Sequence, residues 1–217
     1  MADITLLDLI RFVLEILGAV LMLVVSIISF YHAAKGKDIA GLTFGMAFLV
    51  FFVSRAVLVV LQLTTGLKNI AGSHVNEYVW WYVSLSMIPF AVGCFASVFS
   101  SGKTSSAIVA PLILIAGIGC AVPFIEKIVP VIMPFSSYGA FVWFVAAIFL
   151  FATALMYYFY NFKAKDRFRL WMGHGFSLMA VSCTLSIFSG SNNVLLFMSI
   201  LAQFLGLFIV FYEIQFA

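Results

Sequence analysis

Residues 19–30 read AVLMLVVSIISF, and this stretch decides the fold because apolar side chains cover all of its faces. Such a run, with neither alternation nor a polar stripe, is typical of a helix surrounded by lipid. The whole chain has this character: of 217 residues, 65% are hydrophobic and 9% are charged, and the mean hydropathy is +1.21. The alternation that a membrane β-barrel needs is absent. The sequence therefore predicts an all-α integral membrane protein.

Polar breaks on either side of this stretch divide the chain into seven apolar segments. Each is long enough to cross a hydrocarbon core of about 30 Å, which needs roughly 20 helical residues. The first segment lacks the basic start and cleavage site of a signal peptide, so we expect a true membrane helix there. The predicted helices are residues 5–33, 39–65, 78–100, 105–125, 133–161, 169–189 and 193–213.

Basic residues are distributed unevenly over the predicted loops. Seven fall in the loops after the first, third and fifth helices, whereas the opposite loops hold only Lys68 and Lys127. Because short cytoplasmic loops carry the excess of lysine and arginine, the N-terminus is predicted outside and the C-terminus inside the cell, in the plasma membrane. The net charge of +3 suits an anionic inner leaflet, and no nucleic-acid partner is expected. The seven residues are Lys35, Lys37, Lys103, Lys163, Lys165, Arg167 and Arg169.

Two of the basic loops have nearly the same sequence. KGKDIAGLTFG at 35–45 aligns with KAKDRFRLWMG at 163–173, and identities continue into the next helix. We call the shift along the chain that places Lys35 on Lys163 the repeat offset. The matched pairs are Lys35/Lys163, Lys37/Lys165, Asp38/Asp166, Leu42/Leu170, Gly45/Gly173, Phe48/Phe176, Val53/Val181 and Ser54/Ser182.

These matches extend beyond what topology alone explains. A preference of inner loops for K-x-K-D accounts for only three of them. We therefore expect a single membrane domain with two parallel three-helix repeats, 1–103 and 129–217, joined by a linker helix in 104–128.

The stretch from Ile28 to Gln62 resembles the PQ-loop repeat of the SWEET sugar transporters, cystinosin-like exporters and the KDEL receptor. In that pattern a basic loop precedes a Gly-Leu-Ser type turn that opens the second helix. Here Lys37 and then Gly41, Leu42 and Thr43 occupy those places. The three-one-three layout and the N-out orientation are also similar to that family. The resemblance implies a compact transporter or receptor fold.

The Pro-Gln pair of that family is absent from both copies. Ile28 and Ser29 stand in its place in the first copy, and Met156 and Tyr157 in the second. Proline lets the first helix of each repeat bend, so its loss argues against the same rocking motion.

Two ionisable residues fall deep inside predicted helices, where a charge is expensive and usually faces the protein interior. Glu15 and Arg55 are predicted at depths in the membrane that agree to within about one helical turn, so the geometry allows an ion pair between them. At the repeat offset they correspond to Trp143 and Cys183, so the repeat itself does not need these charges. Two interpretations stay open: a substrate or proton site, and a structural pair that fixes helix register.

Further polar residues are candidates for the lining of a central path. Asn193 and Gln203 recur along one side of the last predicted helix, and His174 lies near the inner boundary, where it either lines a gate or hydrogen-bonds near a helix end. The candidate ligand or ion path comprises Arg55, Glu15, Gln203, Asn193 and His174. The structural and inner-loop set comprises Lys35, Lys37, Asp38, Lys163, Lys165, Asp166, Gly45 and Gly173.

No pattern in the sequence is typical of catalysis, so we expect neither an enzyme nor a cofactor. The histidines lie too near the headgroups for axial haem ligation, and no catalytic triad, paired carboxylate or metal-ligand set is visible. No lysine follows Lys165, which removes the amine that retinal needs.

Three functional classes remain. The first is a small-solute or ion transporter with a central path between the repeats. The second is a seven-helix sensor that binds a ligand and signals through a separate protein at the basic loop FKAKDRFR, residues 162–169. The third is a non-catalytic subunit of a membrane complex, and a homo-oligomer is also open. The internal repeat and the PQ-loop resemblance favour the transporter.

Overall fold

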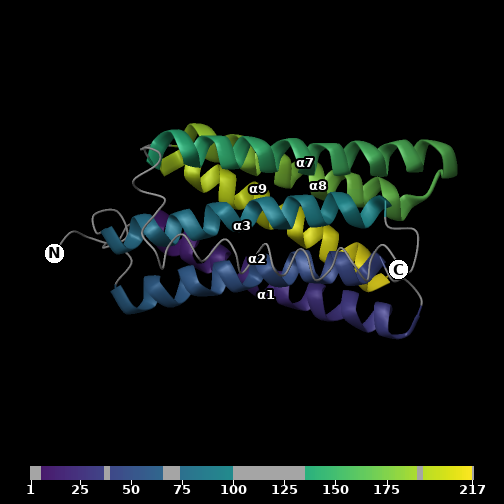
Figure 1. The fold of residues 1–217 in the computed structure, drawn as a ribbon, viewed down its shortest axis with the longest axis horizontal. Coiled ribbons are helices and arrows are strands. Elements are labelled where there is room, and N and C mark those ends of the chain that lie inside the picture. The colour runs from purple at the N-terminus through teal and green to yellow at the C-terminus, as the bar shows by residue number, and fades with distance from the viewer. Residues whose placement is uncertain (1–5, 37–39, 66–73, 100–134, 190–192, 217) are drawn as a thin grey trace.

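The computed structural model of the protein describes residues 6–36, 40–65, 74–99, 135–189 and 193–216, and nearly all of these are helical, with no strand among them. The described helices agree with six of the predicted spans to within four residues at each end, which confirms the all-α prediction for this part of the chain. The predicted span 105–125 lies outside the described residues, so the total of seven stays a prediction. The helices are α1 (Leu6–Ala34), α2 (Ala40–Thr65), α3 (His74–Phe99), α7 (Phe135–Ala164), α8 (Arg167–Ser189) and α9 (Asn193–Phe216) (Figure 1).

Five of these helices are long and apolar enough to cross a membrane, with mean hydropathies from 1.3 to 2.6. In the described part of α3 the apolar stretch, Ser86–Val98, is shorter. Large apolar side chains are exposed at helical spacing along the outside of the bundle, for example Val13, Leu17 and Val20 on α1. In a bilayer such stripes face acyl chains, whereas in water they would promote aggregation. The protein is therefore a multi-pass integral membrane protein.

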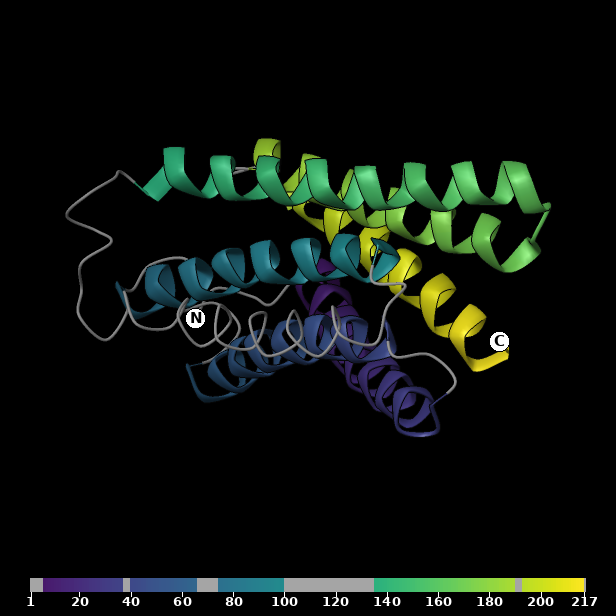
Figure 2. The same cartoon turned by 45° about the vertical axis from the view of Figure 1, so that its right-hand side comes forward.

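The described helices pack in a closed ring (Figures 1 and 2). α1 contacts α2 and α9, α2 contacts α3, α3 contacts α7, α7 contacts α8, and α8 contacts α9. We refer to α1, α2 and α3 as the first triplet and to α7, α8 and α9 as the second triplet. The ends of α1, α7 and α9 and the starts of α2 and α8 lie together at one end of the bundle (Figure 1). This is called the basic end, because it carries Lys35, Lys163, Lys165, Arg167 and Arg169.

Lys35, which follows α1, and Lys163, in the last turn of α7, each lie over an aromatic ring. The Lys35 ammonium lies 4.3 Å from the centre of the Tyr31 ring, and the Lys163 ammonium lies 4.4 Å from the centre of the Phe159 ring. The two rings, Tyr31 and Phe159, are separated by the repeat offset, as the two lysines are. These cation–π contacts hold each amine near the headgroup region while its alkyl stem covers apolar surface.

The start of α8 is set by Asp166. Its Oδ1 accepts a hydrogen bond from the Phe168 amide at 3.1 Å, as an N-cap residue does, and its Oδ2 lies 3.4 Å from Arg169 Nε. Lys165 before it adopts a left-handed backbone conformation (φ 49°), which breaks the chain out of α7. Asp166 thus has a structural role at the helix junction. The corresponding residues of the first loop, Lys37 and Asp38, lie outside the described residues.

Two glycines allow close helix packing at corresponding positions of the triplets. A Cβ atom added at Gly45 would lie 2.8 Å from the Phe30 ring, and one added at Gly173 would lie 2.6 Å from the Tyr158 ring. Small residues let membrane helices approach closely, so these glycines fit α2 against α1 and α8 against α7. Both the glycines and the rings are separated by the repeat offset.

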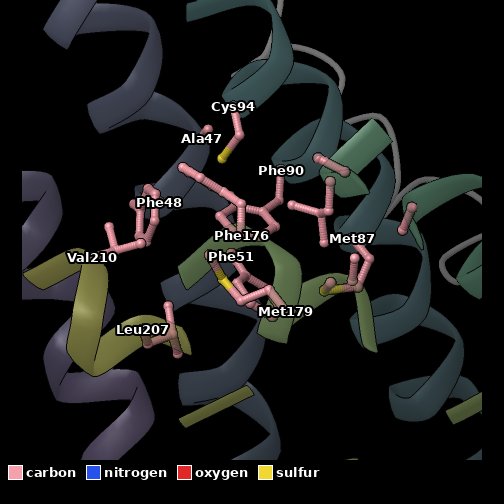
Figure 3. Packing of buried hydrophobic residues seen from close by; sticks show 14 of the residues in the cluster. Ala47, Phe48, Phe51, Met87, Phe90, Cys94, Phe176, Met179, Leu207 and Val210 are labelled. Atoms are coloured by element: carbon pink, nitrogen blue, oxygen red, sulfur yellow. The ribbon is translucent and has the colours of Figure 1, made fainter. Parts of the chain in front are cut away.

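The inside of the ring is filled mainly by large apolar side chains (Figure 3). Four fully buried phenylalanines, Phe48, Phe51, Phe90 and Phe176, form what we call the aromatic layer. Phe90 links two of them, with ring centres 5.0 Å from Phe48 and 4.6 Å from Phe51. The Phe48 contact is edge to face and the Phe51 contact is stacked, so Phe90 on α3 packs closely against two rings of α2.

Candidate functional site

A cavity of about 340 Å³ lies at the basic end of the bundle. We call it the inner cavity. Its volume falls in the range of small-molecule sites, about 300–1,000 Å³. All six described helices contribute to its wall, so it lies inside the ring and not on its lipid face. The lining residues are Ser29, His32, Ala40, Gly41, Phe44, Ser97, Tyr157, Phe168, Met172 and Ile214.

Six of these ten residues form three pairs whose members are separated by the repeat offset. In each pair one residue belongs to α1 or α2 and the other to α7 or α8. The inner cavity therefore lies between corresponding surfaces of the two triplets. The pairs are Ser29/Tyr157, Ala40/Phe168 and Phe44/Met172.

The polar groups of the inner cavity are held by their own helices. The Ser29 hydroxyl donates a 2.7 Å hydrogen bond to the Val25 carbonyl, and the Ser97 hydroxyl donates one of 2.7 Å to a carbonyl of α3. The Tyr157 ring stacks on the Phe176 ring, with centres 5.6 Å apart and an interplanar angle of 6°. The wall is thus a fixed surface of aromatic faces with a few oriented polar atoms.

The aromatic layer separates the inner cavity from the buried charges. Phe44 in the cavity wall meets Phe176 at 6.1 Å and Phe48 at 4.7 Å between ring centres. On the far side of the layer, the Arg55 guanidinium lies 5.1 Å from the centre of the Phe51 ring. A chain of ring contacts, from Phe44 through Phe48, Phe90 and Phe51, therefore connects the cavity wall to Arg55.

Three of the five predicted path residues come together beyond the aromatic layer. Arg55 Nη2 donates a 2.8 Å hydrogen bond to Gln203 Oε1, from the first triplet to the second. Glu15 forms an ion pair with Arg11, with 3.2 Å between Oε1 and Nε. Glu15, Arg55 and Gln203 are all buried, at 5 to 7% exposure. We call Arg11, Glu15, Arg55 and Gln203 the polar cluster.

The polar cluster leaves almost no free volume. Glu15, Arg55 and Gln203 line a cavity of only about 10 Å³, close to the minimum that holds one water molecule. Arg55 Nε has no hydrogen-bond partner among the described residues. The described residues of the polar cluster therefore leave no room for a solute between them, whereas the basic end holds a cavity.

The distance between the two sites follows from helix geometry. On α2, Phe44 and Arg55 are eleven residues apart, and on α9, Gln203 and Ile214 are also eleven apart. At a rise of about 1.5 Å per residue, the polar cluster lies about 16 Å from the inner cavity along the bundle. Both helices give the same separation, so the two sites are stacked along one axis.

The other two predicted path residues are not part of this arrangement. His174 is exposed, its Nδ1 lies 2.8 Å from the Tyr158 hydroxyl, and its ring contacts Trp171 edge to face. His174 thus has a side-chain partner on α7, and it is not among the residues that line the two cavities. Asn193 begins α9, and its side chain lies outside the described residues.

Sequence reasoning does not single out the residues of the inner cavity. Ser29 and Tyr157 enter it only as residues that replace the Pro-Gln pair, and His32 only as a residue near the membrane boundary. A signal for two of them is present: Ser29 and Tyr157 occupy corresponding positions of the two copies. No such pairing marks His32 or Ser97.

Neither a group of metal-binding side chains nor a similar known protein indicates what the inner cavity or the polar cluster does. In the part of the chain that the structure describes, no three His, Cys, Asp or Glu side chains lie close enough to hold a metal ion. The described cysteines, Cys94 and Cys183, are buried and free. No family model, no curated protein and no solved structure matches the chain. The fold and the two stacked sites therefore define the class, a multi-pass helical membrane protein.

Proposed function

We propose that the protein is a transporter that carries a small solute or ion along a central path between two parallel three-helix repeats. One observation carries this proposal: the inner cavity is lined by three pairs of residues at the repeat offset. Transporters built from internal repeats bind their substrates at the interface between the repeats.

Paired contacts support the repeat itself. Phe30 on Gly45 and Tyr158 on Gly173 are equivalent packing contacts, and the two lysines on aromatic rings at the basic end are equivalent cation–π contacts. Inner loops favour lysine through topology alone, but topology does not require an aromatic ring over a glycine at the same offset. The proposed domain arrangement is one membrane domain with repeats 1–103 and 129–217 and a linker helix in 104–128.

The arrangement of the two sites supports alternating access. The inner cavity holds free volume at the basic end, and the aromatic layer and the polar cluster close the other side. The bond between Arg55 and Gln203 joins α2 to α9, and thus the first triplet to the second. Opening toward the other side would separate Arg55 from Gln203. We therefore expect their hydrogen bond to stabilise the conformation that is closed on that side.

The proposed orientation follows from the basic end. If this end faces the cytoplasm, the inner cavity opens inward and the polar cluster lies toward the outside of the plasma membrane. The proposed partners are the bilayer and a small-molecule or ion substrate. The protein needs no catalytic residue or cofactor for this role, and the basic loop at 162–169 is a candidate contact for a protein partner or a second copy.

Solute flux tests the proposal directly. Purified protein in liposomes is compared with Arg55→Ala and Glu15→Ala over a panel of neutral, anionic and cationic solutes, with Cys183→Ala as the matched control at the position that corresponds to Arg55. We expect flux of at least one solute by the wild type and the control, and its loss in both charge variants. If folded wild-type protein transported none of the solutes, the result would contradict transport and favour the sensor or subunit classes.

A further inference from the structure

We infer that the inner cavity binds an uncharged solute with a flat apolar body and one or two hydrogen-bond donors. The inference rests on the proposed transport function, because it names the class of substrate for the same site.

The first argument concerns charge. Among the described residues that line the cavity, none is Asp, Glu, Lys or Arg. Lys35 and Lys163 lie over Tyr31 and Phe159, which are 55% and 53% exposed, and so lie on the outside of the bundle. The polar cluster is about 16 Å away behind the aromatic layer. An ionised solute would lose its hydration without gaining a partner of opposite charge, which strongly disfavours it.

The second argument concerns shape. The wall from the second triplet presents the aromatic residues Tyr157 and Phe168, and the wall from the first triplet presents Phe44 beside the small residues Ser29, Ala40 and Gly41. Aromatic side chains therefore contribute to both walls of the cavity. A planar ring or a flat apolar chain placed there gains the stacking and dispersion contacts that aromatic faces offer.

The third argument concerns hydrogen bonding. The Ser29 hydroxyl gives its proton to the Val25 carbonyl, so its oxygen offers lone pairs to the cavity. The imidazole ring of His32 brings two nitrogen atoms that can take part in hydrogen bonds. A solute with one or two N–H or O–H groups is satisfied by these side chains. A solute rich in hydroxyls would leave several of them unpaired against Met172 and Ile214.

Three indoles of similar size separate these classes by charge alone. Indole-3-acetamide is neutral, indole-3-acetate is an anion and tryptamine is a cation. Binding is measured by equilibrium dialysis against protein in nanodiscs, with empty nanodiscs of the same lipid to subtract partitioning, and with glucose as a polyol probe. We expect saturable binding of the amide, at least tenfold tighter than that of the other three probes.

Two sets of variants locate the binding. Ala40→Phe should abolish it by filling the cavity, whereas Ala34→Phe, at an exposed position at the end of α1, should leave it unchanged. Tyr157→Leu should weaken binding about tenfold through loss of the aromatic face, and Tyr157→Phe should restore it to within about twofold. A merely structural role of Tyr157 would alter stability without this selective recovery.

The outcomes separate this inference from the proposed function. Equal or tighter binding of the anion, the cation or glucose, or no binding of the amide, would overturn the inference. Flux of a charged solute that Ala40→Phe blocks would also overturn it while the transport function stands. Saturable binding of the amide without flux of any solute would support the inference and contradict transport.

Discussion

In the first triplet the Phe30 ring covers Gly45, and in the second triplet the Tyr158 ring covers Gly173 at the same offset along the chain. Serines also join the second and third helices of each triplet: Ser54 corresponds to Ser182 at the repeat offset, whereas their partners Ser86 and Ser199 do not correspond to each other. Ser54 and Ser86 lie 2.7 Å apart between α2 and α3, and the Ser182 and Ser199 hydroxyls lie 3.2 Å apart between α8 and α9. Contacts within each triplet are thus made twice with the same chemistry.

The buried charged residues that the structure describes, in contrast, occur only in the first triplet. Arg55 in α2 corresponds to Cys183 in α8, and Glu15 in α1 corresponds to Trp143 in α7. Both corresponding positions in α2 and α8 are nevertheless buried, with Arg55 at 5% and Cys183 at 1% exposure. The comparison teaches that shared residues build the architecture, whereas residues confined to one triplet are candidates for the function.

The largest expected effect is at Arg55. Arg55→Met removes the donor to Gln203 and the positive charge beside Glu15, so we expect the free energy of unfolding to fall by about 3 kcal/mol. Cys183→Ala, at the corresponding position, should lower it by about 1 kcal/mol. Denaturation in mixed detergent micelles, followed by circular dichroism, measures both.

A double variant sharpens this prediction. In Arg55→Met/Glu15→Leu no charge stays buried in the cluster, because Arg11 is partly exposed and reaches water. Much of the lost stability should return, since apolar replacement of a whole buried pair is often neutral. If the double variant were less stable than Arg55→Met, the electrostatic explanation of the cluster would be wrong.

The next largest effect is at the glycines. Gly45→Ala and Gly173→Ala each place a methyl group within 2.8 Å of a ring atom, so both should lower the free energy of unfolding by about 1–3 kcal/mol and by similar amounts. Gly18→Ala is the matched control, because its methyl group would meet Leu207 at 3.9 Å. Equivalence of the triplets would be contradicted by a large effect at one glycine and none at the other.

The smallest effect is expected at the serine pairs. Ser54→Ala and Ser182→Ala should each lower stability by about 0.6 kcal/mol, the average for hydrogen bonds between membrane helices. Double-mutant cycles with Ser86→Ala and Ser199→Ala isolate the two interactions. Coupling energies that differ by more than about 1 kcal/mol would break the comparison at these positions.

Much of the helical architecture could be predicted because a membrane helix is fixed locally, by the length of one apolar run. The shared depth of Glu15 and Arg55 follows from counting residues along two such runs. The inner cavity could not be predicted in this way. Phe44 and Met172 in its wall do not differ in type from core residues, and a cavity depends on how side-chain volumes from six helices add up.

Blocking the inner cavity during transport tests the central claim most directly. Cys94, Cys120 and Cys183 are replaced by alanine, and Ser97→Cys in the cavity wall is compared with Ala34→Cys at the exposed end of α1. A small uncharged thiol reagent is added, and solute flux into liposomes is followed before and after complete labelling. A path through the cavity predicts that labelling abolishes flux in the Ser97→Cys variant and leaves it unchanged in the Ala34→Cys variant. Undiminished flux after complete labelling of the Ser97→Cys variant would contradict a path through this cavity.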